Sequence, residues 1–318
     1  MWFSNLHIYR LTRPFELDAT QLAEKLAEKP FTPCHSQQQE SYGWVAPLGN
    51  AGNDWVHAAN GYIMIAARQQ ERILPAAVIK EKLEDSIRSI EAGENRKISR
   101  KERQSMKDEL VFELLPKAFT RSRRQYAYIA PQHQLIVIDS ASASRAEALL
   151  NALRETIGSL AVVPLTTRSV TGHCMTSWLK SGQLPAPFSA GSECELKDMQ
   201  QQGGVIRCRH QDLLADEMTA HINTGMMVTR LHLNWKDRIE CIVDEKMVVR
   251  RLRFLELVQE QASASQADDA ASQFDVDFTI MTAELADFIH DLVEAFGGVN
   301  HDAQQPAAAP DTLSEARA

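Results

Sequence analysis

Hydrophobic and polar positions change their period several times along the 318-residue chain. Alternation with period two predicts a strand in "LHIYRLT" and a long strand in "GYIMIAARQQERIL" after Gly61. It also predicts a hairpin in "QYAYIAPQHQLIVIDS", with its turn at Pro131–His133. Apolar residues spaced by three and four predict helices in "DATQLAEKLAEK", opened by Asp18, and in "ASASRAEALLNALRETIGS", ended by Gly158. The first half is therefore expected to be a strand-rich unit that contains helices.

A helical pattern interrupts this strand-rich unit between Pro75 and Leu115. It breaks once, at "EAGENRK", and Pro116 closes it because a proline ring blocks continuation of a helix. A helical segment inserted between two strands has no place in the sheet. We expect it to project from the strand-rich unit.

A second unit is predicted after Pro164. It is expected to begin with short helices in "TSWLKSG" and "SECELKDMQQQGG", followed by a strand in "VIRCRHQ" and a helix in "LADEMTAHINTG". Two or three strands are then predicted in "MVTRLHLNWKDRIECIVDEKMVVRRLRF", with a tight turn near 244–246. The last predicted elements are a strand and an amphipathic helix in "FDVDFTIMTAELADFIHDLVEAFGG". The tail from Val299 has too little apolar content to pack and is expected to be flexible. The fold class is α+β, with units at 1–74 plus 116–164, at 75–115 and at 165–298, and a tail at 299–318.

Composition changes this picture only through charge and cysteine usage. The formal net charge is −8, yet residues 80–124 hold thirteen Lys and Arg against nine acids, and residues 259–318 hold one Arg against twelve acids. A basic region on an acidic chain can bind polyanions while the remainder discourages non-specific adhesion. Five scattered cysteines without a CxxC pair indicate free thiols in a reducing cytoplasm, rather than a disulfide framework or a structural zinc site. No secretory signal and no membrane span can be read.

The densest cationic stretch is "RKISRKERQSMK", residues 96–107, where six of twelve residues are basic. Ser99 and Glu102 form a capping box that predicts a helix start. The cations are Arg96 and Lys97 before the helix, Arg100, Arg103 and Lys107 on one face, and Lys101 beside them. Cations in a first helical turn oppose the helix dipole, which phosphates would compensate. The alternative is a solvated face whose cations pair with Glu102, Asp108 and Glu109.

Two further cationic sets follow. Lys117, Arg121, Arg123 and Arg124 surround Phe119, whose ring could stack on a base, anchor a partner chain or fold back into the core. Arg207, Arg209 and His210 lie in "GGVIRCRHQD", and Arg250, Arg251 and Arg253 lie in "VVRRLRF". Strand alternation places Arg207 with Arg209, and Arg251 with Arg253, on shared faces. Three basic sites favour a surface that binds a polyanion.

Signals for catalysis are weak. The sequence lacks GxxxxGK[ST], HExxH, GxSxG and a GxGxxG after a strand. Asp275 and Asp277 in "FDVDF" would share a strand face, as a Mg²⁺ site could use, although no third ligand is evident. We expect no enzyme activity, metal or cofactor. The alternatives are a Mg²⁺-dependent nuclease using these two aspartates, or a scaffold whose basic helix binds an acidic protein.

Long motifs in a fixed order resemble the RdgC family of bacterial recombination-associated proteins. They include "WFSNLHIYRL", "GWVAPLG", "ANGYIMIAAR", "RILPAAVIK", "KDELVFELLPKAF", "LRETIGSLAVVPL", "GGVIRCRHQDL" and "MTAHINTGMMVTRL". The resemblance runs from Trp2 to about Gly298. It implies a non-enzymatic, cytoplasmic and nucleoid-associated protein that binds double-stranded DNA with little sequence preference, and single-stranded DNA is a second candidate ligand. It also implies a homodimeric ring that duplex DNA threads, restraint of the RecA recombinase by occupying DNA, and a link to replication-fork recovery.

The resemblance also implies a subunit with three parts. These are a centre (1–74 plus 116–164), a helical tip (75–115) and a base (165–298), with the ring closed by tip-to-tip and base-to-base contacts. Phe119 in "LLPKAF" matches the aromatic residue of the tip contact, and Arg209, His210 and Gln211 match a DNA-touching finger. His210 stands where a lysine is usual, and histidine is mostly neutral at pH 7. Arg207 and Arg209 could carry that contact instead.

Overall fold

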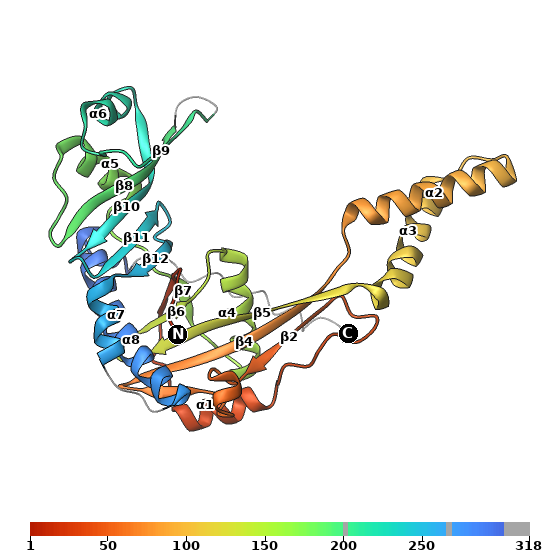
Figure 1. The fold of residues 1–318 in the computed structure, drawn as a ribbon, viewed down its shortest axis with the longest axis horizontal. Helices are drawn as coiled ribbons and strands as arrows, with labels where there is room; N and C mark the ends of the chain where they lie inside the picture. Colours follow the sequence, from red (N-terminus) through yellow and green to blue (C-terminus); the bar gives the residue numbers. More distant parts are fainter. Residues whose placement is uncertain (200–202, 265–268, 302–318) are drawn as a thin grey trace, which may run out of the picture.

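The computed structural model describes residues 1–199, 203–264 and 269–301 as an α+β protein with two antiparallel sheets. Figure 1 shows a U-shaped chain. The first sheet forms the bend, the second sheet with its helices forms one arm, and a pair of helices ends the other arm. The predicted α+β class is therefore confirmed for the single chain.

The first sheet has seven strands in the order β2-β4-β5-β6-β1-β7, with β3 paired to β4. Their bounds are β1 His7–Leu11, β2 Glu40–Val45, β3 His57–Ala59, β4 Tyr62–Ile73, β5 Phe119–Ala130, β6 Leu135–Ile138 and β7 Val162–Pro164, with a short 3₁₀ turn, η1, at Gly49–Ala51. Helices α1 (Ala19–Ala27) and α4 (Ala143–Ile157) cover one face and bury a core that includes Leu22, Ile65 and Leu149. The predicted hairpin of β5 and β6 is confirmed, as is Asp18 as the cap of α1.

Strands β4 and β5 form the long ribbon of the sheet, and β2 pairs with β4 as far as Glu71. Their inner halves are buried at Ile63–Ala67 and Ala127–Ala130, and their outer halves carry polar residues. The outer ends lead into α2 (Ala76–Glu94) and α3 (Arg100–Leu114), followed by the 3₁₀ turn η2 (Leu115–Lys117). Asn95 ends α2 in the left-handed conformation, and Ser99 caps α3. The predicted projecting helices, with their break in "EAGENRK", are confirmed.

The second sheet has the order β12-β11-β10-β8-β9. Its strands are β8 Phe188–Asp198, β9 Val205–Arg209, β10 Met226–Trp235, β11 Ile239–Asp244 and β12 Val249–Phe254, and the helices of this half are α5 Thr171–Ser181, α6 Asp216–Asn223, α7 Glu256–Ala264 and α8 Ala270–Ala295. Leu196, Leu231 and Val243 are buried in the core that this sheet shares with α5, α6 and α8. No helix of the described residues covers the opposite face of the sheet, which looks toward the concave side of the U (Figure 1).

Two predicted elements of this half are wrong. Residues of "SECELKD" form strand β8 instead of a helix, because buried Cys194 and Leu196 alternate with the more exposed Glu193 and Glu195 and β10 pairs alongside. The "FDVDF" segment belongs to helix α8 instead of a strand. Asp269 caps this helix, because its carboxylate accepts a hydrogen bond from the Ser272 N–H. From Phe278 onward the buried residues of α8 recur with the spacing of one helix face.

The two sheets share one continuous hydrophobic core. Leu6 pairs with Val249 of β12 through backbone hydrogen bonds of 2.8 and 3.0 Å, which joins the start of the chain to the second sheet. Tyr128 of β5 packs against Phe3 and against Phe278 of α8. The bend of the U is therefore a packed junction. The prediction for the tail after Val299 falls almost entirely on residues 302–318, outside the described part of the chain.

Candidate nucleic-acid interface

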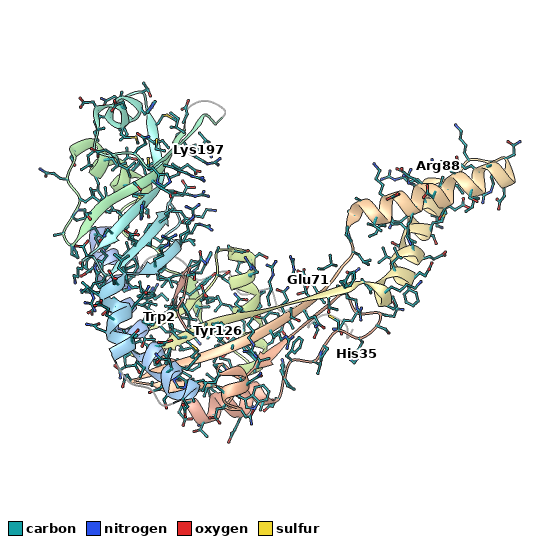
Figure 2. All side chains as sticks on the ribbon, viewed as in Figure 1. Trp2, His35, Glu71, Arg88, Tyr126 and Lys197 are labelled. Atoms are coloured by element: carbon teal, nitrogen blue, oxygen red, sulfur yellow. The ribbon has the colours of Figure 1, made fainter. Side chains whose placement is uncertain are left out.

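The helix-free face of the second sheet concentrates cations. Residues directly opposite each other in an antiparallel sheet share a face, and the register pairs Glu195 with both Arg207 and Arg230, and Glu193 with Arg209. Lys197 lies two residues beyond Glu195 and points toward the concave side in Figure 2. We call this set the sheet patch: Lys197, Arg207, Arg209, Arg230 and Arg251, with Glu193 and Glu195. The set therefore holds five cations and two carboxylates, and Asp244, opposite Arg230 on the same face, pairs with Arg250.

The two carboxylates of the sheet patch pair with three of its arginines. Glu195 Oε2 lies 2.8 Å from Arg207 Nε and 3.4 Å from Arg230 Nη1. Burial raises the pKa of Glu195, but hydrogen bonds from Arg207 and Thr229 and the charge of Arg230 outweigh it, so the pKa is lowered. Glu193 Oε2 lies 3.0 Å from Arg251 Nη1. A shared carboxylate that stays ionised orders the cations without neutralising them all.

The predicted finger residues lie at the end of β9. Arg207 and Arg209 share a face, as predicted from strand alternation. His210 is exposed with φ +53°, in the left-handed region, and the backbone N–H of Gln211 donates to the Ser192 carbonyl at 3.2 Å. This backbone bond fixes the turn, so the side chains of His210 and Gln211 remain at the surface beside Arg209.

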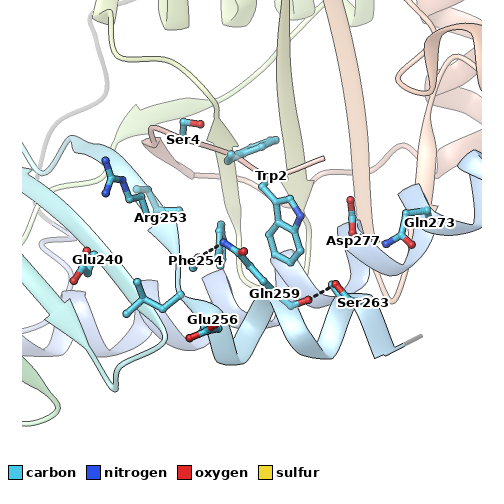
Figure 3. A pocket seen from close by; sticks show the side chains of 14 residues that line it. Trp2, Ser4, Glu240, Arg253, Phe254, Glu256, Gln259, Ser263, Gln273 and Asp277 are labelled. Atoms are coloured by element: carbon cyan, nitrogen blue, oxygen red, sulfur yellow. Dashed lines mark hydrogen bonds between the residues drawn. The ribbon is translucent and has the colours of Figure 1, made fainter. Parts of the chain in front are cut away.

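The three arginines of β12 have different surroundings. Arg250 Nε lies 3.2 Å from Asp244, and its Nη1 donates to the Ala141 carbonyl at 2.6 Å, which ties β12 to the first sheet. Arg251, with φ +49°, belongs to the sheet patch. Arg253 lines a pocket of about 710 Å³ with Trp2 and Gln259 (Figure 3). Arg250 is therefore structural.

That pocket lies between the start of the chain and α7. Gln259 Nε2 donates to the Phe254 carbonyl at 2.7 Å, and Ser263 Oγ donates to the Gln259 carbonyl at 2.9 Å, as Figure 3 shows. The ring centroids of Trp2 and Phe254 are 4.7 Å apart. The amide and the hydroxyl at its centre are thus occupied by α7 and β12 themselves, and we assign the pocket no ligand.

The cations of the helical arm divide into paired and unpaired residues. Arg96 contacts Glu94 at 2.6 Å and Glu102 at 2.6 and 2.8 Å. These hydrogen bonds raise the pKa of Arg96, and the one with Arg96 lowers the pKa of Glu102. Arg103 lies 3.9 Å from Glu84 of α2. Within the described residues, Lys97, Arg100, Lys101 and Lys107 are exposed and make no ion pair. Among the described residues, Arg96 is thus the one cation of the stretch 96–107 that pairs with an acid named in the alternative, Glu102, whereas Arg103 pairs with Glu84.

The cations around Phe119 lie on two faces of the β4–β5 ribbon. Arg121 sits opposite Glu71 and binds it, with one Nε–Oε1 distance of 2.8 Å, and Arg123 sits opposite Gln69 on the same face. Arg124 lies on the other face, with its guanidinium close to Gly49. Lys117 Nζ lies 3.1 Å from Glu113. The predicted cluster therefore does not form one continuous surface.

Phe119 is 86% exposed at the start of β5. Its cross-strand neighbour Ile73 is also an exposed large apolar residue, as are Val78 on α2 and Phe112 on α3. A ring that folded back into the core is therefore excluded. The apolar residues at the root and on the helices of this arm instead suit contact with another molecule. We call Ile73, Val78, Phe112 and Phe119 the arm patch.

Arg72 positions the segment that carries Phe119. Its Nη1 donates to the carbonyls of Leu115, Pro116 and Ala118 at 3.1, 3.4 and 3.3 Å, and its Nη2 donates to Cys34 and His35 at 3.4 and 3.3 Å. The last carbonyls of a helix lack partners within the helix. A cation bound to these carbonyls also interacts favourably with the negative end of the helix dipole. Arg72 thus clamps η2 to the loop before β2.

The predicted pair of aspartates is not assembled. Residues two apart on a helix point about 200° apart, and α8 directs Asp277 to the Met1 ammonium and Gln273, and Asp275 to His57 at 3.1 Å. No group of three or more His, Cys, Asp or Glu side chains that could hold a metal occurs in residues 1–199, 203–264 and 269–301. The strand geometry on which the nuclease alternative rested is therefore wrong.

Comparison with known proteins decides the family. A family profile described as "Putative exonuclease, RdgC" matches residues 1–299. The chain belongs to the RdgC family. Proteins named recombination-associated protein RdgC from Pseudomonas aeruginosa strain LESB58 and Aeromonas hydrophila are 44% and 43% identical to it, over 299 and 298 residues. Each alignment covers 94% of this chain and 98% of the relative, so the predicted membership is confirmed.

Membership in the RdgC family supports a role in DNA recombination through the name that these relatives carry. The profile's description names an exonuclease, and our expectation that the chain is not an enzyme stays a prediction. Among the described residues, no helix has the length and apolarity needed to cross a membrane.

Three residues were missed by sequence reasoning about this RdgC-family chain. Lys197 and Arg230 were overlooked because β8 was predicted as a helix, which removed the strand partners that bring them beside Arg207. Arg72 was read as one polar residue of a long strand. The available signal was a cation three residues before Pro75, where the chain leaves the strand, because helix ends need donors for their carbonyls.

Proposed function

We propose that this RdgC-family protein binds double-stranded DNA without sequence preference on the concave side of its U. The observation that carries the proposal is the sheet patch, a set of five cations and two carboxylates on one face of the second sheet that no described helix covers. Side chains on a sheet face can contact phosphates, and such contacts position a protein without reading bases. The unpaired Lys97, Arg100, Lys101 and Lys107 of the other arm add cations at a second site.

We further propose that two copies close into a ring around the duplex. The arm patch supports this, because it leaves Phe119 and Phe112 exposed at 86% and 63%. A contact between the arm patches of two copies would bury these rings, and aromatic residues often dominate such contacts. Encirclement would prolong residence on DNA and restrain RecA by occupying its substrate. Nucleoid association would follow from DNA binding.

Salt dependence tests the electrostatic half of this proposal. If about six phosphates are contacted, affinity should fall about a thousandfold between 50 and 200 mM salt. Fluorescence anisotropy on short duplexes of several sequences measures this. Similar constants across sequences with a steep salt slope support the proposal. A flat salt response would instead favour the scaffold alternative, in which the basic helix binds an acidic protein.

Topology tests the ring. Retention should be longer on a covalently closed plasmid than on the same plasmid after linearisation, because a threaded ring leaves a free end by sliding. Equal escape rates would contradict encirclement. The same plasmid, incubated with Mg²⁺, tests the nuclease alternative that the family description raises. Nicking above background that survives Asp275→Asn and Asp277→Asn would indicate a catalytic site elsewhere in the chain.

A further inference from the structure

Two cysteines face each other across strands β8 and β9. The register places Cys194 directly opposite Cys208, between the pairs Glu193–Arg209 and Glu195–Arg207. Because side chains alternate along a strand, both thiols lie on the core-facing side, opposite to the sheet patch. Cys194 is buried, and Cys208 is partly exposed.

The two thiols are cross-strand neighbours. Burial, followed by the influence of neighbouring Cys208, raises the pKa of Cys194 to about 12. Cys208 Sγ also lies 3.6 Å from Met218 Sδ of α6. Directly opposite residues in an antiparallel pair have Cβ atoms about 4.5–5.5 Å apart, and a disulfide needs about 3.5–4.5 Å. Closing the bond therefore requires a shift of about an ångström, which an edge strand can supply.

We propose that Cys194 and Cys208 are an oxidative modification site, at which a peroxide converts the dithiol to a cross-strand disulfide that fastens β9 to β8. The functional consequence, but not the chemistry, rests on the proposed DNA binding. All five cysteines are free thiols in the structure.

The reaction starts at Cys208, because it is the more accessible thiol. Its thiolate attacks one peroxide oxygen, so an S–O bond forms, the O–O bond breaks and the leaving hydroxide becomes water on protonation. The Cys194 sulfur then attacks the sulfenic sulfur. An S–S bond forms, the S–O bond breaks and the second hydroxide leaves as water with the proton of Cys194. Two thiols lose two electrons, and one peroxide is reduced to two waters.

The consequence concerns the cations of the sheet patch. Strand β9 is the last strand of the sheet and pairs only with β8 over Val205–Arg209. It carries Arg207 and Arg209 and leads into His210. A covalent link at Cys208 restricts fraying of this edge, so fewer conformations are lost when the arginines engage phosphates. Oxidation should slow dissociation from linear duplex DNA about threefold, and dithiothreitol should restore the original rate.

Peptide mass spectrometry on the full chain tests the site. After treatment with hydrogen peroxide and alkylation of free thiols, a peptide pair joined through Cys194 and Cys208 should appear. It should be absent in Cys208→Ser and present in the matched controls Cys34→Ser and Cys174→Ser. Oxidation confined to other residues, or only sulfinic acid at Cys208, would overturn the proposal. Because Cys208→Ser could fold poorly, loss of the joined peptide from wild-type protein after dithiothreitol serves as the second measurement.

Dissociation from linear duplex, measured on reduced, oxidised and re-reduced wild-type protein, tests the consequence. A slower rate only in the oxidised state supports it. Equal rates in all three states, with the disulfide present, would refute the effect on the finger. Failure of every state to bind DNA would refute the proposed function, while the joined peptide would still establish the modification site.

Discussion

Replacing Arg72 with alanine should loosen the root of the helical arm while leaving the two sheets folded. The guanidinium donates to five carbonyl oxygens at 3.1–3.4 Å, three of them in Leu115–Ala118. A hydrogen bond from a charged group contributes about 1.5–3 kcal/mol. Nη1 has only two protons for its three acceptors, and the site is partly open to water. We therefore expect a loss of about 3 kcal/mol in the local opening free energy.

Amide hydrogen exchange measures this loss directly. A change of about 3 kcal/mol corresponds to exchange about a hundredfold faster, and it should be confined to residues 114–121 and the loop at 34–35. Amides of the buried halves of β4 and β5 should keep their rates. Arg72→Lys is the matched control, because an ammonium retains the charge but cannot bridge both carbonyl groups, so its effect should be intermediate. Unchanged protection at 114–121 in Arg72→Ala would refute the clamp.

The remaining predictions concern the arm patch, the sheet patch and the junction. Phe119→Ala should weaken self-association about tenfold or more in analytical ultracentrifugation and leave binding to linear DNA intact. Arg209→Gln should lower the slope of log affinity against log salt by about one and weaken binding equally across sequences. The pKa of His7 is lowered, mainly by burial and also by the charge of Arg250. The hydrogen bond with the Ser140 carbonyl and the charges of Asp244 and Glu147 act in the opposite direction. The unfolded state therefore takes up the proton first, so urea denaturation should show stability falling as pH drops below about 6.5, the ordinary histidine value.

Each of these predictions has a control variant or an outcome that would contradict it. Lys25→Gln removes one cation from α1, on the other side of the first sheet from α8, and should leave the salt slope unchanged. His7→Gln should flatten the loss of stability between pH 7 and 5, and an unaltered pH profile would show that another group is responsible. Loss of DNA binding in Phe119→Ala would mean that this ring contacts DNA instead of a second copy.

Sequence reasoning succeeded where one physical signal dominated. The apolar run Ile63–Ala67 and the hairpin around Pro131 could only suit a buried sheet, and Pro75 and Pro116 set limits on the inserted helices. It failed where two periods overlapped. "FDVDF" alternates like a strand, but the cap at Asp269 and the core contacts of Phe278 make it helical. Local alternation cannot reveal a helix whose start lies several residues earlier.

The candidate site was predicted less completely than the fold. Residues of one strand, such as Arg207 and Arg209, were placed correctly because alternation is local. Arg230 joins them only through the register of β8 against both β9 and β10, which depends on packing across the whole sheet. Charge runs also overstated the surface around Phe119, since Glu71 engages Arg121 and Arg124 lies on the opposite face.

The shared core at the bend has a mechanical consequence. Phe3, Tyr128 and Phe278 pack between the two sheets, so the angle between them cannot change without opening close-packed contacts. Among the described residues, the outer halves of β4 and β5 contribute nothing to the buried core clusters, although β2 pairs with β4 as far as Glu71. We therefore expect the molecule to bend most easily in the ribbon of β4 and β5. This ribbon connects the two rigidly joined sheets to helices α2 and α3. A long polymer that enters between the two arms would bend the β4–β5 ribbon, while the two sheets keep their relative angle.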